Sequence, residues 1–224
     1  MGLILNIDTA TETAYVNIAD KGVIIQERKS IEQKDHASFL QPAIKELTAA
    51  LDISLKDLDA IAVCAGPGSY TGLRVGMASA KGLCYALHKP LIAVNSLEIL
   101  ANAAQAAINE ENKKESLICP MIDARRMEVF TALYDASMNV VMEPCAMILE
   151  PESFSQQIQQ IFFIGSGITK WEKICPSKTS NLIKKYNTGA SMALLAGKSF
   201  IKGQFAHLTN IVPMYIKDFH VVTK

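Results

Sequence analysis

The spacing of apolar residues divides the chain into strand-like and helix-like segments. Short apolar runs and alternating patterns predict strands, whereas apolar residues three and four positions apart predict helices. In the first half, strands are predicted at residues 3–7, 13–19, 23–28, 59–65 and 91–94, and helices at 37–51, 70–88 and 96–108. In the second half, strands are predicted at 116–122, 127–134, 140–148 and 161–164, and helices near 151–160 and 190–202.

This order of elements predicts an α/β protein with two lobes. The first half has a strand meander followed by alternating helices and strands, which produces a mixed sheet with helices on both faces. The second half begins the same plan and leaves it incomplete. Charged residues without periodicity at 109–115 mark a hinge, so we expect one lobe at residues 1–110 and a second at 111–224.

The composition is that of a globular protein. Half of the 224 residues are apolar, a fifth are charged, and 22 Lys and Arg balance 22 Asp and Glu. This hydrophobicity excludes intrinsic disorder, and the zero net charge argues against a chain that binds nucleic acid or an anionic membrane by itself. The cysteines form no C-x-x-C pair, and the sequence has neither a signal peptide nor an apolar run of about 18 residues. We therefore expect a cytoplasmic protein without a membrane span.

Three loops follow predicted strands and are candidates for ligand binding. In α/β sheets, ligands bind beyond the carboxyl ends of the strands, and a glycine-rich turn that begins a helix suits an anion. Each loop alone is more often an ordinary structural turn, but loops from both halves together suggest a nucleotide-sized cleft. The candidate cofactor-binding residues are Asp8, Thr9, Thr11, Gly66, Gly68, Ser69, Gly165 and Gly167.

Other catalytic patterns are missing from the sequence. The histidines form no H-x-x-x-H or H-E-x-x-H pair, so no histidine metal site is predicted, and no G-x-S-x-G nucleophile motif occurs. Asp123, Arg125 and Arg126 stand together at a predicted turn between two strands. They indicate either a salt-linked structural turn or a contact to an anion or a partner.

The long helix at 70–88 has a wide apolar surface. Small and apolar side chains cover roughly 220° of its circumference, whereas a helix packed on one side needs only about 100°. Gly72, Gly76 and Ala80 predict a groove shallow enough for another helix backbone. We expect the sheet to cover one side, and either the helix at 37–51 or a second protein that binds both helices to cover the other. The candidate interface residues are Phe39, Leu40, Ile44, Leu47, Gly72, Leu73, Gly76, Met77, Ala80 and Leu83.

Several motifs resemble the TsaB (YeaZ) family. They are Ile7-Asp8-Thr9-Ala10-Thr11-Glu12, the run GPGSYTGLRVG at 66–76, Ile122-Asp123-Ala124-Arg125 and Pro213-Met214-Tyr215-Ile216-Lys217. The resemblance covers nearly the whole chain and implies an actin-like ATPase (ASKHA, ribonuclease H-like) fold with a reduced second lobe. It also implies a role in forming threonylcarbamoyladenosine (t6A) at position 37 of tRNAs that read ANN codons.

The resemblance also implies partners. Family members support the transferase TsaD, which is their paralogue, together with the ATPase TsaE, and they associate through the two helices at 37–51 and 70–88. We therefore expect a heterodimer with TsaD, a homodimer when the chain is alone, and contact with tRNA only through the complex. Binding of ATP or ADP by this chain is expected to be weak or vestigial.

One departure from the paralogue implies that this chain is not an enzyme. TsaD binds a metal through an H-x-x-x-H pair in the context V-N-H-x-x-x-H, and the matching stretch here places Ser96 and Leu100 where the two histidines stand. Neither side chain binds iron or zinc as an imidazole does. The alternative is a stand-alone actin-like ATP-dependent kinase or hydrolase, in which Asp8 positions a metal or a base and the loop at 66–69 binds phosphate.

Overall fold

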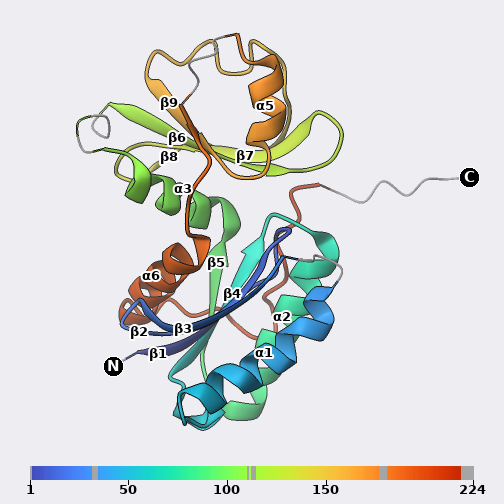
Figure 1. The fold of residues 1–224 in the computed structure, drawn as a ribbon, viewed down its shortest axis with the longest axis vertical. Helices are drawn as coiled ribbons and strands as arrows, with labels where there is room; N and C mark the ends of the chain where they lie inside the picture. Colours follow the sequence, from blue (N-terminus) through green and yellow to red (C-terminus); the bar gives the residue numbers. More distant parts are fainter. Residues whose placement is uncertain (1, 32–34, 110, 112–114, 177–180, 218–224) are drawn as a thin grey trace, which may run out of the picture.

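The computed structural model describes residues 2–31, 35–109, 111, 115–176 and 181–217, which form two lobes (Figure 1). The first lobe is built on a five-stranded sheet with the order β3-β2-β1-β4-β5. Its strands are β1 (Leu3–Asp8), β2 (Ala14–Asp20), β3 (Val23–Ser30), β4 (Ala60–Gly66) and β5 (Leu91–Asn95). β1 runs antiparallel to β2 and parallel to β4. Asp8 and Gly66 therefore end neighbouring strands at the same edge of the sheet.

The second lobe repeats the strand order of the first. Its sheet has the order β10-β9-β6-β7-β8. If the strands of each lobe are numbered 1 to 5 along the chain, both sheets have the order 3-2-1-4-5, read from the appropriate edge. The strands are β6 (Ser116–Asp123), β7 (Glu128–Tyr134), β8 (Val140–Ile148), β9 (Gln160–Ile164) and β10 (Asn181–Ile183). β6 is parallel to β9 and antiparallel to β7. The second half was expected to leave the plan of the first incomplete, but its sheet has the same number and order of strands.

The helices show where the second lobe is reduced. In the first lobe α1 (His36–Ala50) and α2 (Tyr70–Leu87) cover one face of the sheet, with the short helix η2 (Leu55–Asp57) between α1 and β4. In the described part of the second lobe, the short α5 (Ile168–Ile174) follows β9 at the position that α2 has after β4 in the first lobe. The helix predicted near 151–160 is wrong: residues 151–156 form turns, in which Phe154 packs into the core while Ile158 beyond them is fully exposed.

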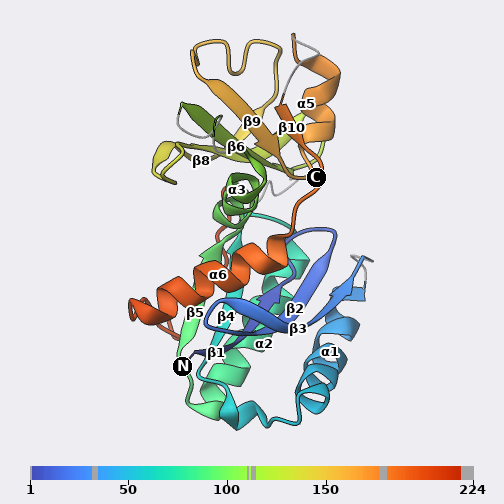
Figure 2. The same cartoon turned by 60° about the vertical axis from the view of Figure 1, so that its left-hand side comes forward.

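Two helices lie between the lobes and exchange partners. α3 (Ser96–Ala107) follows the first sheet along the chain but packs mainly against β6 and β9 of the second. α6 (Thr188–Ile201) follows the second sheet but covers the free face of the first, and it contacts α3 (Figure 2). A division of the chain at one position after residue 110 therefore does not describe the packing. None of the helices in the described parts of the chain is long and apolar enough to cross a membrane.

An extended segment at residues 206–217, which we call the strap, also returns to the first lobe. The Ala206 amide donates to the carbonyl oxygen of Leu91 (2.8 Å), and the Met214 amide donates to that of Ala65 (2.7 Å). Lys81 on α2 donates to the carbonyl oxygen of Ile211 (3.1 Å). The strap therefore runs along α2 and is bonded to both β4 and β5.

The wide apolar surface of α2 is accounted for within this chain. The sheet, α1 and the strap all pack against it in one core cluster. A Cβ atom on Gly72 would overlap the carbonyl oxygen of Thr9, and one on Gly76 would lie 2.5 Å from the Thr9 hydroxyl. The groove that was predicted to receive another helix is thus filled by the loop after β1.

Alanine substitutions at two glycines of α2 should have opposite effects on stability. The position of a side chain at Gly82 is open space, so Gly82→Ala should raise the free energy of unfolding by about 0.5–1 kcal/mol. Gly72→Ala should lower it by about 1–3 kcal/mol, because the new Cβ overlaps the Thr9 backbone. Urea denaturation measures both values. Two stabilised variants would contradict the close approach of α2 to Thr9.

Candidate functional site

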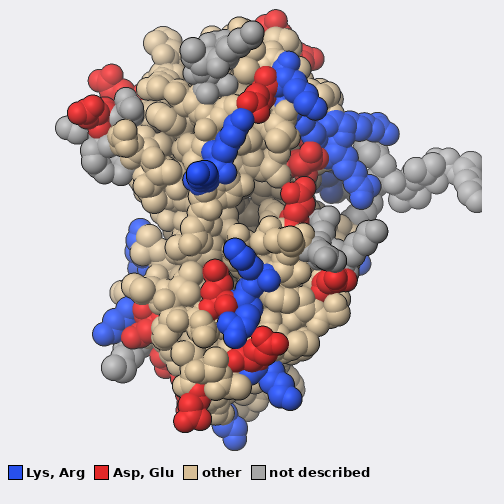
Figure 3. Space-filling model, in the orientation of Figure 1, with Lys and Arg blue, Asp and Glu red and all other residues tan. Residues whose placement is uncertain are grey.

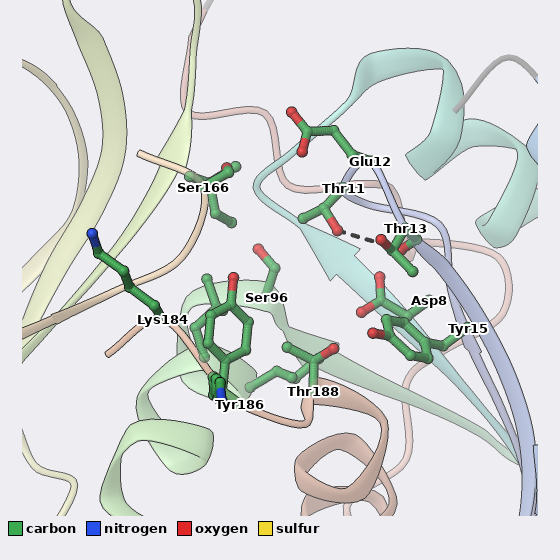
Figure 4. Close-up of a pocket in the computed structure, with 14 residues that line it drawn as sticks. Asp8, Thr11, Glu12, Thr13, Tyr15, Ser96, Ser166, Lys184, Tyr186 and Thr188 are labelled. Atoms are coloured by element: carbon green, nitrogen blue, oxygen red, sulfur yellow. Dashed lines mark hydrogen bonds between the residues drawn. The ribbon is translucent and has the colours of Figure 1, made fainter. Parts of the chain in front are cut away.

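Asp8 lies at the end of β1 on the floor of a cavity between the lobes (Figure 4). Only 6% of the residue is exposed. Its carboxylate accepts a hydrogen bond from the Ala10 amide (3.0 Å) and one from the Cys64 thiol. Burial raises the pKa of Asp8 above its ordinary value despite these bonds and the nearby His36. The site therefore disfavours the charged carboxylate that a metal or a general base requires.

The walls of this cavity come from both lobes. It has a volume of about 400 Å³, and the surface is hollowed between the lobes in Figure 3. In Figure 4, Asp8 and Tyr15 lie side by side at one end, Ser166 lies opposite them, and the amino group of Lys184 turns away. The residues that line it include Asp8, Thr11, Glu12, Thr13, Tyr15, Ser96, Ser166, Lys184, Tyr186 and Thr188.

Sequence analysis missed the part of the cavity that lies before α6. Tyr186 and Thr188 line the wall there, and Tyr15 faces them from β2. The helix was predicted to begin at Ala190, whereas its N-cap is Asn187, whose side chain accepts from the Ala190 amide (3.1 Å). Asn is among the preferred N-cap residues, so Asn187 could have indicated from the sequence that the helix begins at Thr188.

Acidic groups dominate the floor of the cavity. Burial raises the pKa of Tyr15, and the charges of Glu27 and Asp8 raise it further. Burial also raises the pKa of the Cys64 thiol far above its usual value, again with a contribution from Asp8. Cys64 is therefore not a reactive thiolate. Burial thus favours the protonated forms of these groups, and Lys184 and Lys185 line the same cavity.

Two amides of the loop after β4 donate to acceptors within the chain. The Ser69 amide donates to the carbonyl oxygen of Ala10 (2.7 Å), and the Gly72 amide donates to the Ser69 hydroxyl (3.3 Å) as a helix N-cap. Gly68 touches Ala10 so closely that a Cβ atom would overlap its carbonyl oxygen, and a Cβ on Gly66 would lie 2.8 Å from the Met214 carbonyl oxygen. These contacts explain the glycines without a phosphate.

The two remaining candidate loops are engaged in the same way. The Thr9 hydroxyl donates to the Gly72 carbonyl oxygen (2.7 Å), and the Thr11 hydroxyl donates to that of Thr13 (3.4 Å). In the second lobe the Gly167 amide donates to the carbonyl oxygen of Met121 (3.0 Å). Gly165 has a φ of 106°, which a residue other than glycine rarely adopts. All three loops reach the space between the lobes, and nucleotide binding there stays a prediction.

The two positions that correspond to metal-binding histidines are used structurally. The Ser96 hydroxyl donates to the carbonyl oxygen of Pro67 (2.5 Å) and ties the start of α3 to the loop after β4. Leu100 lies in the apolar cluster between α3 and the second sheet. Among the described residues, no group of three or more His, Cys, Asp or Glu side chains could hold a metal ion.

Most of the candidate interface residues are buried inside this chain. Phe39 and Leu83 are half-buried and pack against the same core cluster. The buried ones are Leu40, Ile44, Leu47, Gly72, Leu73, Gly76, Met77 and Ala80. Their side chains stabilise the first lobe and are not available to a partner, so these residue assignments are corrected. Association through the two helices stays a prediction, and it requires exposed positions.

Comparison with known proteins agrees with this geometry. A family model described as TsaD: tRNA N6-adenosine threonylcarbamoyltransferase matches residues 24–220. The tRNA threonylcarbamoyladenosine biosynthesis protein TsaB of Buchnera aphidicola is 32% identical over 188 residues, which cover 81% of this chain and 84% of that protein. The chain belongs to the TsaB (YeaZ) family.

Other TsaB proteins match over almost the full length. TsaB of Escherichia coli is 27% identical over 226 residues, covering 96% of this chain and 94% of that protein. The structure of YeaZ from Pseudomonas aeruginosa superposes with a TM-score of 0.79 at 27% identity and covers 96% of this chain and 100% of that one. The expected fold class, two lobes of the actin-like (ASKHA, ribonuclease H-like) type with a reduced second lobe, is confirmed.

Replacing the buried carboxyl should change how stability depends on pH. Because the pKa of Asp8 is raised in the folded state, folding retains a proton that the unfolded chain loses. The free energy of unfolding therefore falls as pH rises from the unfolded pKa to the folded one. Asp8→Asn has no carboxyl to titrate, so its stability does not fall with pH for this reason. The difference in melting temperature, variant minus wild type, should therefore be larger at about pH 7.5 than at about pH 4. Thermal unfolding across this range measures the difference, and a gap that stays constant with pH would rule out a raised pKa.

Proposed function

We propose that this chain is a non-catalytic subunit of the machinery that forms t6A at adenosine 37 of ANN-decoding tRNAs, where it pairs with TsaD and acts together with TsaE. The names of its relatives support the pathway. The observation that carries the non-catalytic role is the use of Ser96 and Leu100 as structural residues in the place of a metal-binding pair. The chain then acts by holding its partner.

Nucleotide binding by the chain itself is proposed to be weak or vestigial. The amides of Ala10, Ser69 and Gly167 already donate to acceptors within the chain. A phosphate at these loops would have to break such bonds, and burial disfavours the charged form of Asp8 nearby. Both features support a cleft that has the actin-like shape but binds a nucleotide weakly or not at all.

The outer face of α2 offers a surface for the partner. Ala78, Gly82 and Tyr85 follow one another along this face, and Tyr85 is 80% exposed. Small residues permit close approach of another helix, and an exposed aromatic residue supplies contact area. Both TsaD and a second copy of this chain could use this face, which accounts for a homodimer when the chain is alone.

Arginine on the outer face of α2 should prevent pairing without unfolding the chain. Gly82→Arg places its side chain in open space and replaces a poor helix former by a good one. It should abolish co-elution with TsaD of the same cell on gel filtration, because a bulky charge blocks close helix packing.

The matched control is Ala106→Arg on the exposed end of α3, which should still co-elute. Circular dichroism should show both variants folded. If Gly82→Arg pairs with TsaD as tightly as the control does, the partner does not bind the outer face of α2.

The isolated chain should not turn over ATP. Calorimetry with ATP and Mg²⁺, together with a phosphate-release assay, measures binding and hydrolysis separately. We expect weak or no binding and no steady release, because the loop amides are engaged. Tight binding with turnover that Asp8→Ala abolishes would instead favour a stand-alone kinase or hydrolase.

A further inference from the structure

Basic residues gather around α5 in the second lobe. Figure 3 shows Lys and Arg along α5 and around the turn between β6 and β7, with a few acidic residues among them. Ion pairs connect this region, since Lys170 on α5 contacts Asp123 (2.8 Å) and Lys184 contacts Glu172 of α5 (2.7 Å). The basic face, as we call it, consists of Arg125, Arg126, Lys170, Lys173, Lys184, Lys185 and Lys217.

The basic face has an excess of positive charge although the whole chain is neutral. Within the second lobe its seven cations meet three carboxylates, Asp123, Glu128 and Glu172, which leaves a net charge of about +4, and Glu12 of the first lobe lines the same cavity as Arg125. Lys170, Lys184 and Lys217 are each paired. Within the part of the chain that the structure describes, no ion pair involves the other four. Arg125, Arg126 and Lys173 are exposed, as is Lys185.

The two arginines occupy backbone positions that do not suit them. Arg125 has a φ of 69° and Arg126 a φ of 50°, and residues other than Gly, Asn and Asp rarely adopt this left-handed region. The turn is braced by the Asp123 carboxylate, which accepts from the Arg125 amide (2.7 Å) and pairs with Lys170. Two adjacent arginines at such positions weaken the turn, and a residue kept against local preference is a sign of function.

The turn stands at the opening between the lobes. Arg125 lines a second cavity of about 540 Å³, whose opposite wall is formed by Ser69, Tyr70 and Thr71 at the start of α2. α5 and this turn belong to the second lobe, whereas α1 and the outer face of α2 belong to the first (Figure 1). The basic face and the outer face of α2 therefore belong to different lobes.

We propose that the basic face binds the phosphate backbone of RNA, with Arg125 and Arg126 as its main contacts. The occupant follows from charge: the face gathers guanidinium and ammonium groups, and Arg125, Arg126, Lys173 and Lys185 have no ion pair among the described residues, which matches a polyanion. That the RNA is tRNA rests on the proposed function. The contact goes beyond the expectation that tRNA is reached only through the partners.

A double substitution separates this role from a structural one. Arg125→Asn/Arg126→Gly removes both guanidinium groups and supplies residues that tolerate a positive φ. Its melting temperature should rise, by about 2–4 °C, because the strain in the turn is relieved. A fall in the melting temperature would mean that the arginines support the fold, and it would overturn the proposal.

The same variant should bind RNA more weakly. The probe is a fluorescent transcript of an ANN-decoding tRNA, titrated with the full chain at several salt concentrations between about 50 and 200 mM. The wild type should bind, and the variant should lose about tenfold or more in affinity at the lower end. The slope of log affinity against log salt should become shallower by about 1.4–1.8 for two lost phosphate contacts.

The matched control removes two cations from the first lobe. Lys21→Asn/Lys56→Gln lowers the net charge by two, as the arginine variant does. Lys21 also has a positive φ, of 52°. This variant should bind the tRNA as the wild type does. Equal losses in the two variants, or no binding by the wild-type chain, would overturn the proposal.

The proposed function is tested apart from this contact. Co-elution with TsaD and t6A formation by the reconstituted complex report on the accessory role. If the complex is active and the double variant binds tRNA normally, only the RNA contact is wrong. If the chain neither pairs with TsaD nor supports t6A formation, the proposed function fails whatever the RNA titration shows.

Discussion

The contact between the start of α2 and the loop after β1 determines most of what this molecule can do. The Thr9 hydroxyl and the Ala10 carbonyl oxygen form hydrogen bonds with the backbone of the loop at 66–72. Gly68 and Gly72 permit the close approach because they have no side chain. This contact places Asp8 beneath the loop and uses the amide that an anion would need. It also orients α2, so that its small residues split into a buried side and an outer face.

Local patterns predicted most strands and the long helices. They did not predict the segments whose structure depends on contacts with distant parts of the chain. β1 and β4 were predictable as buried apolar runs. β10 has three residues, too few for a period, and it exists because β9 pairs with it. The apolar arc of α2 showed that the helix is covered but not by what, since Gly72 looks the same against a partner helix as against Thr9. At the site, the sequence identified the loops, and only the structure showed that their donors are already engaged.

Net charge proved a poor guide to local electrostatics. The 22 cations and 22 anions cancel over the chain, yet acidic groups collect on the floor of the cavity at Asp8 and Glu12 while cations collect around α5. Fields at a protein surface depend on this separation rather than on the sum. Lys184 and Lys185 belong to the basic face and also line the cavity that holds Asp8 and Glu12, so charges of both signs meet there.

The exchange of α3 and α6 between the lobes has a consequence for biogenesis. The first sheet leaves the ribosome early, but α6, which with part of α3 covers its free face, follows all ten strands along the chain. Until then the apolar residues of that face, such as Ile4 and Ile92, have no cover. Contacts between such distant segments slow folding and leave apolar surface exposed. The first lobe therefore completes its core only after the strands of the second lobe have been synthesised.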